Sequence, residues 1–91
     1  MIHSLPQLEL LFREGCHLCE DMAEQLYELL PQDSFDLRRV DIDEHPSLRD
    51  QHHTRVPVLR LGEQELCHHF LDLHAVRQGL ASYTRTGVRA D

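Results

Sequence analysis

The chain has 91 residues, of which 41% are hydrophobic, and this length supports one hydrophobic core but not two ordinary domains. Lys and Arg total 9 and Asp and Glu total 16, which gives a formal net charge of −7 at pH 7. Because a negative protein repels a phosphate backbone, we expect no nucleic acid among its partners.

The first residues, Met1 to Phe12, show no export signal. They lack a basic segment followed by a long apolar run and a small-residue cleavage site. No apolar run in the sequence approaches the roughly 20 residues of a membrane span. We therefore expect a cytoplasmic protein that does not associate with a membrane. In such a reducing compartment, paired cysteines are more often catalytic or metal-binding than structural.

An apolar run and a helical stripe follow each other near the start of the chain. The nearly continuous apolar segment from Gln7 to Phe12 predicts a strand buried on both faces. Residues 13–15 then form an exit loop. Apolar residues next recur at helical spacing, which predicts a helix from about Cys16 to Leu30 that Pro31 ends. The stripe consists of Cys19, Met22, Ala23, Leu26, Leu29 and Leu30.

The segment from Phe35 to Ile42 predicts a second strand, after a turn at residues 32–34. Its apolar and polar residues stop alternating between Leu37 and Val40. We therefore expect either a β-bulge or a strand buried on both faces.

A short helix is predicted from about Pro46, because proline suits the first turn of a helix and Leu48 supplies an inward apolar group. His52 and His53 would lie near its end.

Two further strands, Val56 to Leu61 and Gln64 to His68, are predicted on either side of a turn at Gly62 and Glu63. Pro57 should lie at the start of its strand, because it cannot donate a ladder hydrogen bond. The chain therefore continues with a hairpin.

Asp72 can cap a last helix that buries Leu73, Val76 and Leu80. The polar tail of residues 82–91 is expected to fray, so we place the single domain at residues 1–81.

The resulting order is βαβαββα, an α/β pattern. The first strand, helix and strand require a crossover connection and therefore parallel pairing, whereas the turn at Gly62 makes the last two strands antiparallel.

Two motifs within this order of strands and helices resemble those of a known fold. Cys16-His17-Leu18-Cys19 follows the first strand, and Arg55-Val56-Pro57 precedes the third. With these motifs, residues 7–81 resemble the thioredoxin fold and, by their brevity, its glutaredoxin branch. The segments LFREGCHLCEDM, VDIDEHPSLRD and RVPVLRL are similar to a group of small, mostly bacterial glutaredoxin-like proteins. The resemblance implies a central four-stranded mixed sheet flanked by helices.

The resemblance implies a thiol–disulfide oxidoreductase that uses Cys16 and Cys19 on disulfides of proteins or small molecules. On this fold Cys16 lies at a helix N-terminus, where free N–H groups and the helix dipole favour a thiolate, so it is the candidate nucleophile. Cys19, one turn further along, is the candidate resolving cysteine. A protonated His17 can add to the stabilisation of the thiolate, or it can simply face solvent. Arg13 is the nearest upstream cation.

The resemblance also implies that the Val56–Pro57 bond is cis and that its loop faces the nucleophile. Val56 would then offer its backbone N–H and C=O to an extended substrate chain. Without the two cysteines, Pro57 would read as a plain strand-starting proline. The expected substrate-binding residues are Arg13, His17, Arg55, Val56 and Pro57.

Glutathione is considered as a reductant, but its binding signature is incomplete. Glutathione-binding relatives carry paired glycines and an acidic residue after the hairpin, where this chain has residues 66–72, LCHHFLD. We expect no tightly bound cofactor and no metal ligand set. The expected partners are a disulfide-containing protein or glutathione, and the expected state is a monomer.

Two further functions remain open on the sequence. Cys16 and Cys19 could ligate zinc or half of an iron–sulfur site without turnover, although such a site normally needs four ligands. The fold could also serve as an adaptor. Cys67 is expected to be a buried, inert thiol. We expect the neighbouring pair His68 and His69 not to chelate as a unit, because adjacent residues in a strand point to opposite faces.

Overall fold

The computed structural model describes residues 5–86, with side chains described for residues 5–83. Strand β1 spans Gln7–Phe12, as predicted, and helix α1 spans His17–Leu29. The helix begins one residue later than expected because Cys16 is its N-cap, in extended backbone. Leu30 is the C-cap and its N–H donates to the Leu26 carbonyl, after which Pro31 prevents continuation.

Strand β2 spans Asp36–Asp41 and lies between two short 3₁₀ turns, η1 (Gln32–Ser34) and η2 (Ile42–Glu44). Both alternatives expected for this strand are wrong. Its register with β1 is unbroken, so it has no bulge, and Arg38 and Arg39 are both exposed. The reason is its place at the edge of the sheet, where a neighbouring strand lies on one side only.

Helix α2 spans Pro46–His52, and strands β3 and β4 span Val58–Leu61 and Gln64–His68. Strand β3 begins two residues after the predicted start at Val56. The Val56–Pro57 peptide bond is cis, as the resemblance implied, and Pro57 has no N–H to donate to a strand. The turn into β4 uses Gly62 at φ 62°, a backbone conformation that glycine adopts without steric cost.

Helix α3 spans Leu73–Thr86, and the Asp72 carboxylate accepts a hydrogen bond from the Ala75 N–H at 3.1 Å, as a cap does. The helix extends past residue 81, the expected end of the domain, as far as Thr86. No glycine or proline interrupts this polar stretch before Gly87. Residues 87–91 of the expected tail lie outside the described residues.

The four strands form one mixed sheet in the order β2-β1-β3-β4. Strand β1 pairs parallel with β2 and antiparallel with β3, and β3 pairs antiparallel with β4. The predicted parallel first half and antiparallel hairpin are therefore confirmed. A register irregularity does occur, but between Leu59 and Arg60 in the hairpin.

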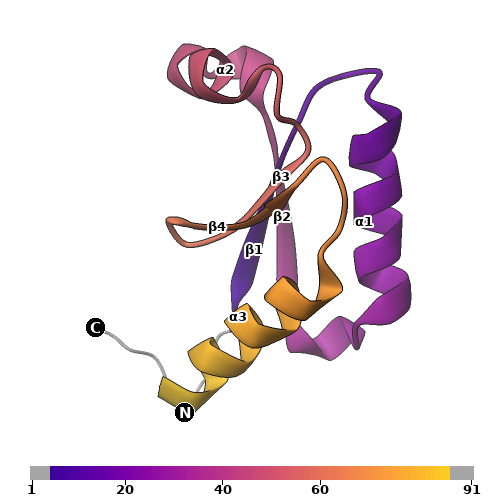
Figure 1. The fold of residues 1–91 in the computed structure, drawn as a ribbon, viewed down its shortest axis with the longest axis vertical. Helices are drawn as coiled ribbons and strands as arrows, with labels where there is room; N and C mark the ends of the chain where they lie inside the picture. Colours follow the sequence, from indigo (N-terminus) through magenta and orange to yellow (C-terminus); the bar gives the residue numbers. More distant parts are fainter. Residues whose placement is uncertain (1–4, 87–91) are drawn as a thin grey trace.

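Two buried clusters lie on opposite faces of the sheet. Helices α1 and α3 cover the face that carries Leu8, Leu10 and Leu59, while α2 covers part of the other face at one end. That second cluster consists of Leu11, Val40, Ile42 and Val58 with Leu48 and Val56. In Figure 1, the loop from β1 to α1 lies at the same end of the molecule as α2.

Among residues 5–86, the helices are too short and too polar to cross a membrane.

Candidate active site

The loop from β1 to α1 places Cys16 at the start of a helix whose first N–H groups lack intrahelical partners. The Cys16 sulfur accepts a hydrogen bond from the Cys19 N–H at 3.1 Å, so a sulfur occupies the position that a Ser or Asp oxygen fills in an ordinary N-cap. Gly15, at φ 77°, makes the turn that delivers Cys16 to this position. Helix dipole and N–H donor both favour negative charge on this sulfur.

Cys16 and Cys19 form a disulfide, with their Cα atoms 5.2 Å apart. The two sulfurs differ in access to solvent. Cys19 lies in the first turn of α1 and is only 3% exposed, whereas Cys16 is partly exposed. An incoming molecule therefore reaches Cys16 before Cys19.

A cleft of about 290 Å³ opens beside this disulfide. Its walls come from the end of β1, the β1–α1 loop, the first turn of α1 and the edge strand β2. The lining residues are Leu10, Phe12, Arg13, Glu14, Gly15, Cys16, Cys19, Glu20 and Arg39. Of the predicted site residues, the two cysteines and Arg13 meet in this cleft.

Arg13 is held in place by a carboxylate from a distant part of the chain. Its guanidinium donates to both oxygens of Asp43, at 3.0 and 3.1 Å. Asp43 is itself fixed, because its N–H donates to the Asp41 side chain at 3.0 Å at the start of η2. This pairing satisfies part of the donor set of Arg13 before any substrate arrives.

His17 is the first residue of α1 and is exposed, and Leu18 is half-buried. His17 does not line the cleft beside the disulfide. A second cleft, of about 320 Å³, has Leu18 on one side and the loop after β4 on the other.

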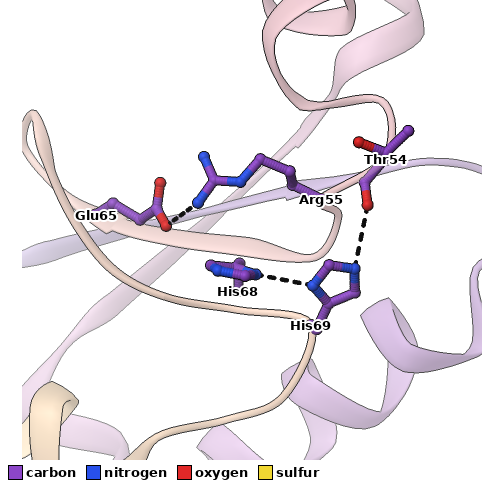
Figure 2. Close-up of polar contacts among 5 residues, drawn as sticks. All are labelled: Thr54, Arg55, Glu65, His68 and His69. Atoms are coloured by element: carbon purple, nitrogen blue, oxygen red, sulfur yellow. Dashed lines mark hydrogen bonds and ion pairs between the residues drawn. The ribbon is translucent and has the colours of Figure 1, made fainter.

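Arg55, Val56 and Pro57 lie just ahead of β3 and do not line the cleft beside the disulfide. The Arg55 guanidinium forms an ion pair with the Glu65 carboxylate of β4 (Figure 2). Pro57 is buried, and its carbonyl accepts a hydrogen bond from the His69 N–H at 2.8 Å. Among residues 5–86, the backbone N–H and C=O of Val56 have no hydrogen-bond partner, so both are available for pairing.

The rings of His68 and His69 meet, contrary to the expectation that they would point apart. Their Nδ1 atoms are 2.8 Å from each other (Figure 2). The physical reason is that β4 ends at His68 and His69 adopts a left-handed backbone, with φ 67°, which redirects its side chain. The alternation of a strand therefore does not apply to this pair.

The second nitrogen of His69 determines its tautomer. His69 Nε2 lies 3.1 Å from the Thr54 carbonyl oxygen, which can only accept, so Nε2 carries the hydrogen. In the neutral ring Nδ1 then accepts from His68 Nδ1–H. The imidazole of His69 thus links the loop before Pro57 to the loop after β4 (Figure 2).

Cys67 is buried in β4, as expected for an inert thiol. Burial raises the pKa of its thiol, and a backbone hydrogen bond at Asp72 offsets part of that rise. Within residues 5–86, no group of three or more His, Cys, Asp or Glu side chains is arranged to hold a metal ion.

The glutaredoxin-like domain family (DUF836) matches residues 7–81. The chain belongs to this family. It is 38% identical over 86 residues to the uncharacterized protein Rv0508 of Mycobacterium tuberculosis, covering 89% of each chain, and equally similar to the uncharacterized protein Mb0520 of Mycobacterium bovis.

Solved structures support the same fold. The solution NMR structure of protein Ne2328 from Nitrosomonas europaea is similar at 37% identity and a TM-score of 0.74, over 87% of this chain and 95% of that one. Thioredoxin 1 from Thermosipho africanus is similar at 20% identity and a TM-score of 0.50, over 87% and 91% of the two chains. The second likeness shows the fold alone, and it confirms the thioredoxin-like architecture expected for this glutaredoxin-like domain.

Sequence reasoning assigned none of Arg39, Asp43, Glu14 and Glu20 to this site, although Arg39 and the two glutamates line the cleft. Arg39 could have been found from the parallel register, which sets it beside Leu10 on the face that carries α1. Asp43 offered only a weak signal, an acidic turn thirty positions away from the arginine that it binds.

Proposed function

We propose that this protein is a dithiol–disulfide oxidoreductase in which Cys16 attacks a disulfide and Cys19 resolves the product. The observation that carries the proposal is the Cys16 sulfur at the N-cap of α1, accepting the Cys19 N–H and bonded to the Cys19 sulfur. A donor aimed at the sulfur stabilises it as a thiolate, both when it attacks and when it leaves.

In the reducing direction, the Cys16 thiolate attacks one sulfur of the substrate disulfide. A mixed disulfide forms, and the other substrate sulfur leaves as a thiolate that takes up a proton. The Cys19 thiol loses its proton, attacks the Cys16 sulfur and releases the second substrate thiolate. Two electrons pass from the protein dithiol to the substrate, and the protein ends with the Cys16–Cys19 disulfide.

The role of the helix N-terminus can be given a magnitude. Lowering a thiol pKa from about 8.5 to about 6 raises the thiolate fraction at pH 7 roughly 30-fold. With a Brønsted slope of about 0.45, the same change lowers the nucleophilicity of each thiolate roughly 13-fold. Attack gains only about twofold. The larger effect is on Cys16 as a leaving group, which makes the disulfide easier to reduce.

The proposed partner is a disulfide-containing protein or a small disulfide, with glutathione as a candidate reductant. For a protein substrate, the unpaired backbone groups of Val56 support pairing with an extended chain, as in strand addition. Arg13, His17, Arg55 and Pro57 stay predictions as substrate-binding residues. We place this activity in a reducing compartment such as the cytoplasm, because a dithiol reductant is regenerated there. The proposed oligomeric state is a monomer.

Two cysteine variants test the order of attack. Reduced Cys19→Ser protein is mixed with oxidised glutathione and examined by intact mass, and we expect a stable adduct on Cys16 because nothing resolves it. Cys16→Ser is the matched variant and should form far less adduct, because Cys19 is buried. Equal labelling of the two variants, or none of either, would contradict the assigned roles.

A further inference from the structure

The cleft beside the disulfide carries charges of both signs. Arg13 and Arg39 contribute guanidinium groups, and Glu14 and Glu20 contribute carboxylates. These four side chains line the same space of about 290 Å³ as the two sulfurs. This volume lies just below the range of roughly 300–1,000 Å³ found for small-molecule pockets. The cleft therefore suits a small molecule rather than a folded surface.

Arg39 is the cation of this cleft that has no carboxylate partner within the described part of the chain. Its guanidinium is exposed, whereas Arg13 is already bound by Asp43. In the register of β1 and β2, Arg39 lies beside Leu10, another lining residue, so it occupies the face of the sheet that carries α1. Its neighbour Arg38 lies beside Glu9 and points to the opposite face.

The two carboxylates lie close to Cys16 in the chain. Glu14 is in the loop that leads to Cys16, and Glu20 is in the first turn of α1. Both side chains are exposed, and neither forms an ion pair among residues 5–83. A purely anionic ligand would meet these carboxylates, and a purely cationic ligand would meet Arg39. A ligand that carries both charges can place its anionic group at Arg39 and its cationic group at Glu14 and Glu20.

We propose that this cleft binds a small zwitterionic disulfide of the amino-acid type, with its carboxylate on Arg39 and its ammonium group on Glu14 and Glu20. The proposal rests on the oxidoreductase function and names a substrate class for it. Arg39 is a specificity-determining residue, since a guanidinium and a carboxylate can form two parallel hydrogen bonds. The sulfur of the bound half-molecule then lies at the cleft wall formed by Cys16.

The reaction with this substrate consists of two thiol–disulfide exchange steps. The Cys16 thiolate forms a bond to the substrate sulfur held in the cleft, and the outer half leaves as an amino-acid thiolate that is protonated. Cys19 then breaks the mixed disulfide and releases the bound half as a second thiol. One molecule of reduced protein supplies both electrons, so the reaction needs no further reductant for a single turnover.

Four disulfides with different charges test the proposal. Reduced protein is mixed separately with cystine, cystamine, 3,3′-dithiodipropionate and 2-hydroxyethyl disulfide, quenched with an alkylating agent and scored by intact mass. Each second-order rate constant is divided by that for the neutral 2-hydroxyethyl disulfide measured with the same variant. This ratio removes any change in the reactivity of the Cys16 thiolate and leaves the effect of substrate charge.

The variant Arg39→Gln is compared with Arg38→Gln, which changes the net charge equally from the adjacent position on the other face. We expect Arg39→Gln to lower the ratio for cystine and dithiodipropionate by about three- to tenfold, as for an exposed arginine–carboxylate contact. The ratio for cystamine should not fall. Arg38→Gln should keep wild-type ratios, and Glu20→Gln should lower the ratios for cystine and cystamine.

The possible failures are distinguishable. If wild-type protein oxidises with the four disulfides but Arg39→Gln and Arg38→Gln give the same ratios, the substrate assignment is overturned and the oxidoreductase function stands. If reduced wild-type protein reacts with none of them, the oxidoreductase function itself fails.

Discussion

Replacing His52 with Leu should stabilise the protein, and the gain should grow as the solution becomes more acidic. His52 ends α2 and is only 8% exposed, and its Nδ1 is buried without a hydrogen-bond partner among the described residues. Burial lowers the pKa of this imidazole below its ordinary value of 6.5, and the nearby charges of Arg55 and Arg60 lower it further, against a smaller opposite effect of Glu65.

The magnitude at neutral pH comes from the unpaired nitrogen. A buried polar group without a partner costs about 1–3 kcal/mol, and leucine fills a similar volume without that cost. We expect a gain of about 1–2 kcal/mol in the free energy of unfolding, which corresponds to about 4–8 °C in Tm per kcal/mol for a chain of this size.

The pH dependence follows from proton linkage. The unfolded chain protonates His52 near the ordinary pKa of 6.5, whereas the folded chain takes up that proton only at a lower pH. Between these two pKa values the unfolded state binds more protons, so wild-type stability falls as pH falls. The gap between His52→Leu and wild type therefore widens below pH 6.5, by at most about 1.4 kcal/mol per pH unit.

Urea unfolding of both proteins between pH 5 and 7.5 measures this gap. The matched control is His53→Leu, which changes the exposed neighbour and should leave both stability and its pH dependence close to wild type. A gap that stays constant with pH, or a His52→Leu protein less stable than wild type at pH 7, would refute the reasoning.

Three further predictions concern the core, the buried thiol and the start of α1. Leu26→Ala should reduce the free energy of unfolding by about 2–5 kcal/mol, while Leu29→Ala, at a position that is 47% exposed, should change it by at most about 0.5 kcal/mol in urea unfolding. In reduced protein, Cys67 should be alkylated by iodoacetamide much more slowly than Cys16, because burial raises its thiol pKa, and urea should abolish this protection. A Cys67 that reacts as fast as Cys16 in the native protein would contradict its burial. Removing the exposed imidazole in His17→Ala should raise the pKa of the Cys16 thiol, followed by the ultraviolet absorbance of its thiolate; an unchanged titration curve would assign His17 no role.

Much of the fold was predictable because local patterns and tertiary packing agree. The apolar run at Gln7–Phe12 and the stripe along His17–Leu29 both reflect burial, except at Leu29, which is 47% exposed. Both elements occur where the pattern placed them. Gly62 and Asp72 likewise have local roles, in a turn and in a cap, that their neighbours reveal.

The errors arose where position in the sheet or backbone conformation overrode the pattern. The interrupted alternation at Leu37 and Val40 reflects an edge strand, and edge position is a property of the whole sheet. The contact between His68 and His69 depends on the left-handed backbone conformation of His69. Non-glycine residues rarely adopt this conformation, so the sequence did not predict it.

Some residues of the candidate site were predictable from the sequence, and others were not. Cys16 and Cys19 are close in sequence, so their geometry on a helix could be predicted from spacing alone. Arg39 comes to the cleft only through the pairing of β2 with β1, and Asp43 reaches Arg13 across thirty positions. Charged side chains at such distances in the chain carry no local signal of their partners.

The central claim is that Cys16 and Cys19 exchange two electrons reversibly, and equilibrium with graded mixtures of reduced and oxidised glutathione tests it most directly. Free thiols are trapped by alkylation and counted by intact mass. We expect one two-electron transition, with a midpoint between about −270 and −120 mV, that disappears in Cys16→Ser. A wild-type protein whose cysteines keep one oxidation state across the whole series would contradict it.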